Sequence, residues 1–208
     1  MELFNFGVYM LTMVGIYGLL ALSLNLQLGF TGLINFGQVM FFAFGAYTSG
    51  LLTVELNVPI PIAMVVAMLV TGLVGMLISL PTRSLKADYW AISTLVAAET
   101  VRLIAINEEW LTGGTFGLMS IPQPLEALVA PAAYPLVFLG LTLVLLAIIY
   151  VLINFLTDSP FGRDLRGVRD DEDLCLALGK NTRMLKVQSM FLAGMIAGLG
   201  GAMFAHYI

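Results

Sequence analysis

The amino-acid sequence predicts an all-α integral membrane protein with about six transmembrane helices. Charged residues make up 11% of its 208 residues and hydrophobic residues 60%, whereas a soluble domain carries about 25% charged residues. Six apolar runs approach or reach the roughly 20 residues that a helix needs to cross a bilayer. We therefore predict one transmembrane domain over residues 1–208, with spans at 6–24, 32–53, 58–80, 90–107, 134–156 and 187–205.

The first two spans are separated by a segment, residues 25–38, that is rich in glycine and in amide side chains. Non-helical backbone at membrane depth persists only where protein or a water-filled path satisfies it. We therefore predict that the second helix starts broken and that this segment lines a substrate path. A tight helix crossing that needs glycine is the alternative. The residues assigned to the path here are Gly32, Asn35, Gly37 and Gln38.

The fourth span, 90–107, carries Glu99 and Arg102 near its middle. A lone charge at the centre of a transmembrane helix costs roughly 2.5–3.5 kcal/mol. At a spacing of i, i+3 the two side chains can pair on one helix face, which lowers that cost. Two interpretations follow: the pair ties this helix to a neighbour, or it lines or gates the path.

The connection after the fourth span, residues 108–133, is long and glycine-rich around Thr112, Gly113 and Gly114. It is a plain connector, an outer gate or a docking rim. In the sixth span Gly194 and Gly198 stand four residues apart, a spacing that favours close helix–helix packing.

Between the fifth and sixth spans lies a polar segment, residues 158–186, for which we predict two short helices. Ser159 is a good N-cap and Pro160 a good first helical residue. Acidic residues 170–173 would start the second helix at its positive end, and Gly179 suits the position that closes it. The segment is either an ordinary charged loop or a docking element for a cytoplasmic partner. Three arginines recur every third residue in its first helix: Arg163, Arg166 and Arg169.

Lysine and arginine predict the orientation of the chain. Of the nine, six lie in 158–186 and two, Arg83 and Lys86, in the loop 81–89, which leaves only Arg102 within a span. Because basic loops stay in the cytoplasm, we expect both loops inside, and the N-terminus and residues 108–133 outside. The protein is thus predicted to be multi-pass in the cell (inner) membrane.

Motifs for catalysis are missing from the sequence, which has no G-x-S-x-G elbow, no H-E-x-x-H and no complete P-loop. The sequence has one cysteine, Cys175, and one histidine, His206, which are too few for a Cys- or His-based metal site. Without a basic soluble patch, nucleic acid is not an expected partner. We predict a transport path, neither an enzyme nor a cofactor-binding protein. One alternative is a stand-alone channel or ion-coupled carrier for a small polar solute such as urea or an amide, and a weaker one is a membrane anchor.

Several short motifs occur in order along nearly the whole chain: GFTGLINFGQ (29–38), FGAY (44–47), DYWAISTL (88–95), Glu99 with Arg102, TGG with GL (112–118), SPFGR through RDDED (159–173), ALG (177–179) and AGLGGA (197–202). Together they resemble the permease family of branched-chain amino acid ABC importers. The stretches DYWA and TGG are similar to the longer-looped of the two permeases that such importers pair.

The resemblance implies a permease subunit that forms the translocation path for branched-chain or related amino acids. Its implied partners are a second permease, two cytoplasmic ATPases, an extracytoplasmic solute-binding protein and membrane lipid. Thr94 joins Glu99 and Arg102 among the path residues. The implied ATPase-coupling residues are Arg163, Arg166, Arg169, Glu172, Asp173, Ala177 and Gly179.

The chain departs from the family pattern in two places. The family's acid-Ala-Ala-x-x-x-Gly pattern falls on Asp173 to Gly179, with Leu174 and Cys175 in place of the two alanines. Family members usually have further spans, whereas this sequence stops at Ile208 just after the sixth span, as a C-terminally truncated member would.

Overall fold

The computed structural model describes residues 2–82, 85, 87–126, 129–131 and 133–208, and no β-strand occurs among them. Arg83 and Lys86, on which part of the predicted orientation rests, lie outside the described residues. The α-helices are α1 (Glu2–Leu24), α2 (Gln38–Val54), α3 (Ile60–Thr82), α4 (Ala87–Asn107), α5 (Glu109–Thr112), α6 (Tyr134–Asp158), α7 (Pro160–Asp170), α8 (Glu172–Ala177) and α9 (Thr182–Ala205). A π-helix, η1 (Asn25–Phe30), continues α1, and a 3₁₀ helix, η2 (Gly114–Phe116), follows α5.

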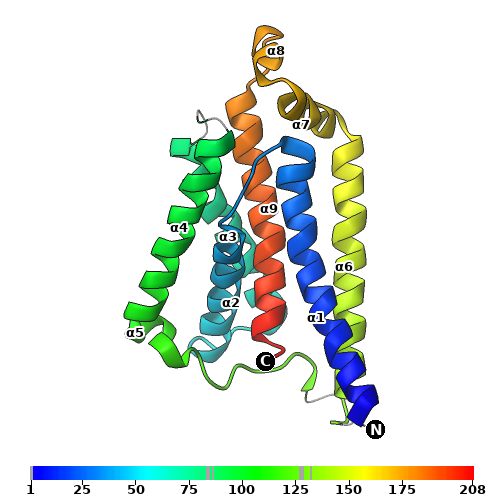
Figure 1. Cartoon of the computed structure of the whole chain (residues 1–208). Coiled ribbons are helices and arrows are strands. Elements are labelled where there is room, and N and C mark those ends of the chain that lie inside the picture. The colour runs from blue at the N-terminus through cyan, green and yellow to red at the C-terminus, as the bar shows by residue number, and fades with distance from the viewer. Residues whose placement is uncertain (1, 83–84, 86, 127–128, 132) are drawn as a thin grey trace.

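The structure confirms the predicted fold class of an all-α integral membrane protein. Helices α1 with η1, α3, α4, α6 and α9 are long and apolar enough to cross a membrane, and α2 is a shorter apolar helix of 17 residues. The predicted break is real but narrower than expected. Residues 25–31 remain helical, residues 32–37 are non-helical, and α2 starts only at Gln38. Figure 1 shows this segment leaving the end of α1, crossing α9 and descending to the start of α2 partway through the bundle.

Helix α9 is the centre of the bundle because its small residues admit its neighbours closely. A Cβ added to Gly198 would lie 2.6 Å from Thr71 Oγ1 of α3, and one added to Gly201 would clash with the carbonyl oxygen of Phe42 in α2. A Cβ on Gly45 of α2 would in turn clash with the backbone of Gly198. The glycine spacing predicted from the sequence therefore places α9 between α2 and α3.

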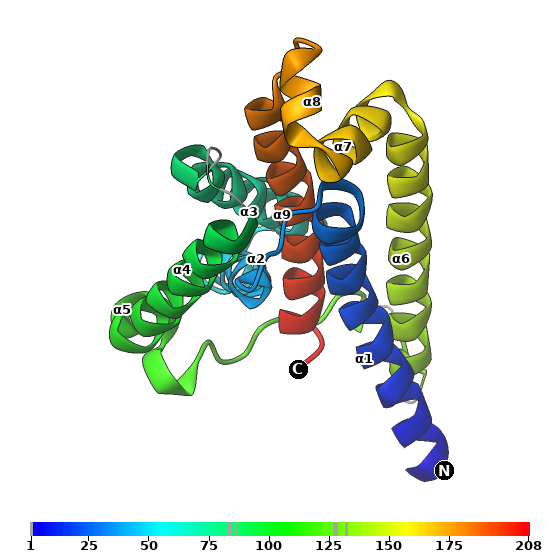
Figure 2. The ribbon, with the colours of Figure 1, turned by 45° about the horizontal axis from the view of Figure 1, so that its top comes forward.

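The outer helices attach to this centre unequally. Helix α6 packs along α1, where Phe138 and Ile149 join Ile16 and Leu19 in the main apolar core. Helix α4 is held by Trp90, which is fully buried in a second apolar cluster. Figures 1 and 2 show α4 and α5 on the far side of the bundle from α1 and α6, with α4 leaning away from α9.

The two ends of the bundle carry different elements. Helices α7 and α8 cap one end, whereas both chain termini, α5 and the loop that follows it lie at the other (Figure 1). The two predicted short helices are confirmed. Asp171 caps α8 by accepting a hydrogen bond from Leu174 N (2.9 Å).

The terminal residues of α7 and α8 occupy the predicted positions. Gly179, at φ 78°, closes α8 with bonds from its own N–H to Leu176 O and from Lys180 N–H to Cys175 O, the Schellman pattern. Ser159 occupies the N-cap position of α7, but its hydroxyl donates to Leu156 O and makes no cap bond to the α7 backbone.

Candidate translocation site and coupling element

The non-helical segment is held by a buried cluster of amide side chains. Asn35 Nδ2 donates to Gln27 Oε1 (2.7 Å) and to Gln38 Oε1 (3.1 Å), while Gln27 Nε2 donates to Gln38 Oε1 (3.0 Å). Gln38 Nε2 donates to Ser23 Oγ (2.7 Å), and this hydroxyl donates to Ala193 O of α9 (2.6 Å). The cluster therefore ties α1, η1 and α2 to the central helix.

The remaining path residues of this region pack α4 against the break. Phe36 N donates to Thr94 Oγ1 (3.2 Å), and Asn35 Oδ1 accepts from Gly37 N (2.8 Å). A Cβ on Gly37 would clash with Thr94 O. Among the predicted path residues, Asn35, Gly37, Gln38 and Thr94 are buried and Gly32 is half-buried, so the amide side chains of the break are sealed by protein in this conformation. Unpaired amides at this depth would cost several kcal/mol each, and mutual hydrogen bonding removes that cost.

Gln27 and Ser23 complete this cluster although sequence reasoning did not assign them to the path. The available signal was their spacing, because Ser23 and Gln27 are four residues apart and so share a helix face. The pairing of the amide side chains depends on how the chain folds back after η1, and this cannot be read from the sequence.

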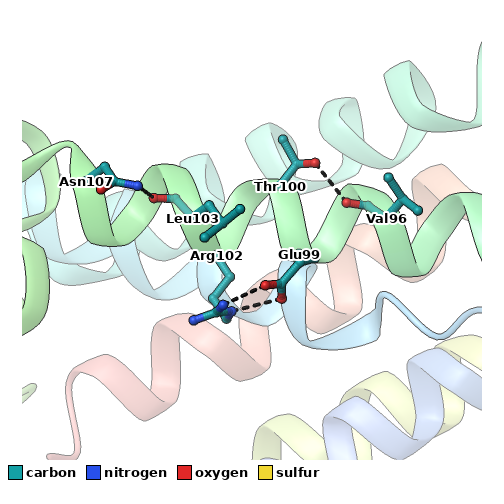
Figure 3. Close-up of polar contacts among 6 residues, drawn as sticks. All are labelled: Val96, Glu99, Thr100, Arg102, Leu103 and Asn107. Carbon is teal, nitrogen blue, oxygen red and sulfur yellow. Dashed lines mark hydrogen bonds and ion pairs between the residues drawn. The ribbon is translucent and has the colours of Figure 1, made fainter.

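Glu99 and Arg102 behave differently from the amide cluster. Arg102 donates from Nε to Glu99 Oε2 (2.9 Å) and from Nη2 to Glu99 Oε1 (2.5 Å). The pair stays open, with 57% of the Arg102 side chain and 54% of the Glu99 side chain exposed. Figure 3 shows the two side chains projecting together from one face of α4.

A cavity of about 600 Å³ lies between α2 and α4, and the ion pair forms part of its wall. Most of the wall is apolar, with Val39, Phe44 and Leu51 on α2 and Leu95 and Ile106 on α4. An apolar cavity with a few convergent polar groups is the usual form of a small-molecule site. The pair is bonded within α4 and makes no hydrogen bond or ion pair to another described element.

The predicted outer-loop residues border the same cavity. Thr112 and Gly114 line it. Thr112 Oγ1 donates to the carbonyl oxygens of Ala105 (2.6 Å) and Glu108 (3.0 Å) and accepts from Gly114 N (3.1 Å). Gly113 has φ 75°, a left-handed conformation that favours glycine. These residues thus form a hydrogen-bonded turn at the end of the cavity next to α5.

The three arginines of α7 have three different environments. Arg163 is exposed, whereas Arg166 Nη2 donates to Thr157 O at the end of α6 (3.1 Å). Arg169 pairs with Asp170 and donates from Nη1 to Gly29 O of η1 (2.6 Å). A Cβ on Gly32, whose φ is 72°, would lie 2.9 Å from Arg169 Cγ. Helix α7 therefore touches the start of the break directly.

Helix α8 contacts α7 and α9 on one side and exposes apolar side chains on the other. Lys186 of α9, whose side chain is 5% exposed, pairs with Glu172 at 2.7 Å. Cys175 Sγ packs against Gly167 of α7, where an added Cβ would lie 2.9 Å from the sulfur. Asp173, Ala177 and Gly179 are exposed. Three leucines are also exposed there: Leu174 (57%), Leu176 (49%) and Leu178 (72%).

A metal centre has no support in the described part of the chain, where no three His, Cys, Asp or Glu residues are grouped to hold an ion.

Comparison with known proteins identifies the family. A sequence profile described as "Branched-chain amino acid transport system / permease component" matches residues 7–208. The chain is 32% identical over 216 residues to the high-affinity branched-chain amino acid transport system permease protein LivM of Escherichia coli, covering 93% of this chain and 51% of that protein. It is 27% identical over 226 residues to the probable branched-chain amino acid transport permease protein LivM of Methanocaldococcus jannaschii, covering 93% of this chain and 65% of that protein.

The chain belongs to the branched-chain amino acid transport permease family, and the resemblance seen in the sequence is confirmed. It spans between about half and two thirds of the length of these curated relatives. No solved structure matches it.

Proposed function

We propose that this chain is a permease subunit of an ABC importer for branched-chain or related amino acids, and that α7 and α8 dock on a cytoplasmic ATPase. Membership of the family supports the transport role. The observation that carries the docking role is the tip of α8, where three leucines are exposed outside the membrane-spanning helices. Exposed apolar groups of this size in a polar segment are typical of a protein contact.

The charge distribution supports a cytoplasmic position for this end. Six of the nine lysines and arginines lie in the segment 158–186 that contains α7 and α8. Because basic segments remain in the cytoplasm, α8 would face the compartment that holds ATP. The N-terminus would then lie outside, and the proposed partners would be a second permease and an extracytoplasmic binding protein as well as two ATPases.

The contact between α7 and η1 supports a coupling role. Arg169 bonds to the Gly29 carbonyl oxygen, and the Gly32 backbone packs on the Arg169 side chain. A displacement of α7 by an ATPase would therefore act directly on the non-helical segment. That segment carries Asn35 and leads directly into Gln38 at the start of α2, so their sealed cluster is what such a movement would open.

Substitution of the exposed leucines tests the docking role. The double variant Leu174→Glu with Leu178→Glu places two charges where an apolar contact is proposed, and we expect the ATPase subunits to be lost from the complex purified in mild detergent. The matched control is Leu56→Glu, because Leu56 is 68% exposed in the connection between α2 and α3 at the opposite end. Retention of the ATPases by the double variant would contradict the proposal.

The same purification separates the second candidate function, a stand-alone channel or carrier, which the ion pair in the otherwise apolar wall of the α2–α4 cavity favours. A chain that purifies without ATPases and drives solute flux without ATP would establish that candidate instead.

A further inference from the structure

The Glu99–Arg102 pair is costly for a purely structural role. Glu99 lies twelve residues after the first residue of α4 and Arg102 five residues before the last, so both are within the span. A half-exposed ion pair at this depth is unfavourable in lipid. Its two hydrogen bonds lie within one helix, so they link α4 to no other helix in the described part of the chain.

Both charged groups keep unused hydrogen-bonding capacity. A guanidinium group has five N–H donors, of which two are bonded to Glu99. The remaining three make no hydrogen bond with the described residues. Each oxygen of Glu99 accepts one bond from Arg102 and retains a free lone pair. The pair therefore presents a donor group and an acceptor group of opposite charge, side by side, to the cavity.

The cavity supplies the complementary apolar surface. Val39, Phe44 and Leu95 line it together with the ion pair. Its volume of about 600 Å³ lies within the range of small-molecule sites, about 300–1,000 Å³. A ligand that fits this wall has two opposite charges close together at one end and an apolar group at the other.

We propose that Glu99 and Arg102 bind the zwitterionic end of an apolar α-amino acid during its passage. The carboxylate of the ligand accepts from the free N–H groups of Arg102, its ammonium donates to Glu99, and its side chain packs on the apolar wall. This inference rests on the proposed transport function and assigns the residues that bind the charged end of its substrate. Urea or a neutral amide carries no charges to match the pair, so the site disfavours them.

The test uses the purified complex of this permease with its partner permease and ATPases, without the binding protein, because the binding protein would impose its own selectivity. Three probes are compared by equilibrium binding: leucine, leucinamide, which lacks the carboxylate, and isocaproate, which lacks the ammonium. Wild-type complex is expected to bind leucine at least about 10-fold more tightly than either analogue, since one charge-assisted hydrogen bond contributes about 1.5–3 kcal/mol.

Variants assign each charge of the ligand to a residue. Arg102→Gln is expected to weaken leucine binding about 10-fold or more while leaving leucinamide binding unchanged. Glu99→Gln is expected to weaken leucine binding while leaving isocaproate binding unchanged. The matched control is Thr100→Val, because Thr100 bonds to its own helix at Val96 O and projects from the other face of α4 (Figure 3). It should bind all three probes as wild type does.

A charge-reversed variant separates ligand binding from a structural or subunit-contact role. Glu99→Arg with Arg102→Glu restores an ion pair, so a structural pair would be rescued and leucine uptake by the complete importer would be normal. If the pair binds the ligand, the apolar wall fixes the direction in which the ligand lies, so the reversed charges no longer match it. Leucine uptake should then be lost although the complex assembles normally.

Equal losses for all three probes, or rescue by the charge reversal, would overturn the inference. Absence of leucine binding to the wild-type complex would also overturn it, whereas absence of ATP-driven uptake by the complete wild-type importer would instead refute the proposed function.

Discussion

At the scale of single residues, His206 shows how one side chain joins three parts of the molecule. It is fully buried at the end of α9. Its Nδ1 lies 2.7 Å from Pro122 O and its Nε2 lies 2.8 Å from Ser49 Oγ of α2. A carbonyl oxygen only accepts, so Nδ1 carries the proton and Nε2 accepts from the Ser49 hydroxyl. The loop after α5 is thereby attached to the bundle.

Burial lowers the pKa of His206, against a smaller opposing effect of its bond to the Pro122 carbonyl. The folded protein therefore holds fewer protons at this residue than the unfolded chain, whose histidine titrates at about 6.5. Stability is fully present above that pH and falls as the pH drops below it, until the lowered folded pKa is passed. We expect the melting temperature of the purified chain to fall between about pH 8 and pH 5.5.

His206→Gln is the variant that checks this assignment, because glutamine retains hydrogen-bonding groups but does not titrate. It should lose about 1–3 kcal/mol at the higher pH through imperfect bonding to Ser49 and Pro122. Its further loss on acidification should be smaller than that of the wild type. An equal loss in both proteins would assign the pH dependence to other groups.

At the scale of elements, the meeting of α7 with the break depends on the backbone conformation of one residue. Gly32 has φ 72° and lies against Arg169. A residue with a Cβ pays roughly 1–2 kcal/mol in this left-handed region, and the Cβ would also press on Arg169. We expect Gly32→Ala to reduce leucine uptake by the complete importer while its subunits still assemble.

Gly140→Ala in α6 is the control for that substitution. A Cβ on Gly140 meets nothing within 4 Å, and alanine favours the helix by about 1 kcal/mol over glycine. Normal uptake by Gly32→Ala would remove this contact from the coupling route. Loss of assembly in Gly32→Ala would show that the contact serves folding only.

The elements themselves were predictable to different degrees. Long apolar runs predict α1, α3, α4, α6 and α9 because the bilayer fixes the length of a span. Local signals predicted α7 and α8: Pro160 at the first helical position, acidic residues 170–173 at the start of the second helix and Gly179 at its end. The cap bond of Asp171 to Leu174 N is a finding of the structure. The extent of the break was not predictable, because the helical state of residues 25–31 depends on contacts such as that between Thr31 Oγ1 and Ser189 Oγ (2.6 Å), which are distant in sequence.

At the scale of the whole molecule, the polar residues divide between a sealed cluster and an open pair. The amides of the break satisfy one another beside α9, whereas Glu99 and Arg102 face a cavity. The sequence grouped both sets into one path because each has polar groups within an apolar run. Burial distinguishes them, and it depends on α4 leaning away from the centre (Figure 2). The sealed cluster is thus suited to hold a conformation and the open pair to meet a ligand.

The predicted orientation can be tested with the single cysteine of the chain. Cys175 lies on α8 and Phe116, which is 83% exposed, lies in η2 at the opposite end. If α8 is cytoplasmic, a membrane-impermeant maleimide applied to intact cells should leave Cys175 unmodified, and a second reagent added after denaturation should then label it fully. In the variant Phe116→Cys with Cys175→Ala, the new cysteine should be blocked in the first step, because it would lie outside the membrane. Cys175 is half-buried with its sulfur beside Gly167, and alanine is the smaller side chain, so this background should fold and assemble. The reverse labelling pattern would show that the predicted orientation is wrong. Helix α8 would then lie outside the cytoplasm, where its exposed leucines could not contact an ATPase.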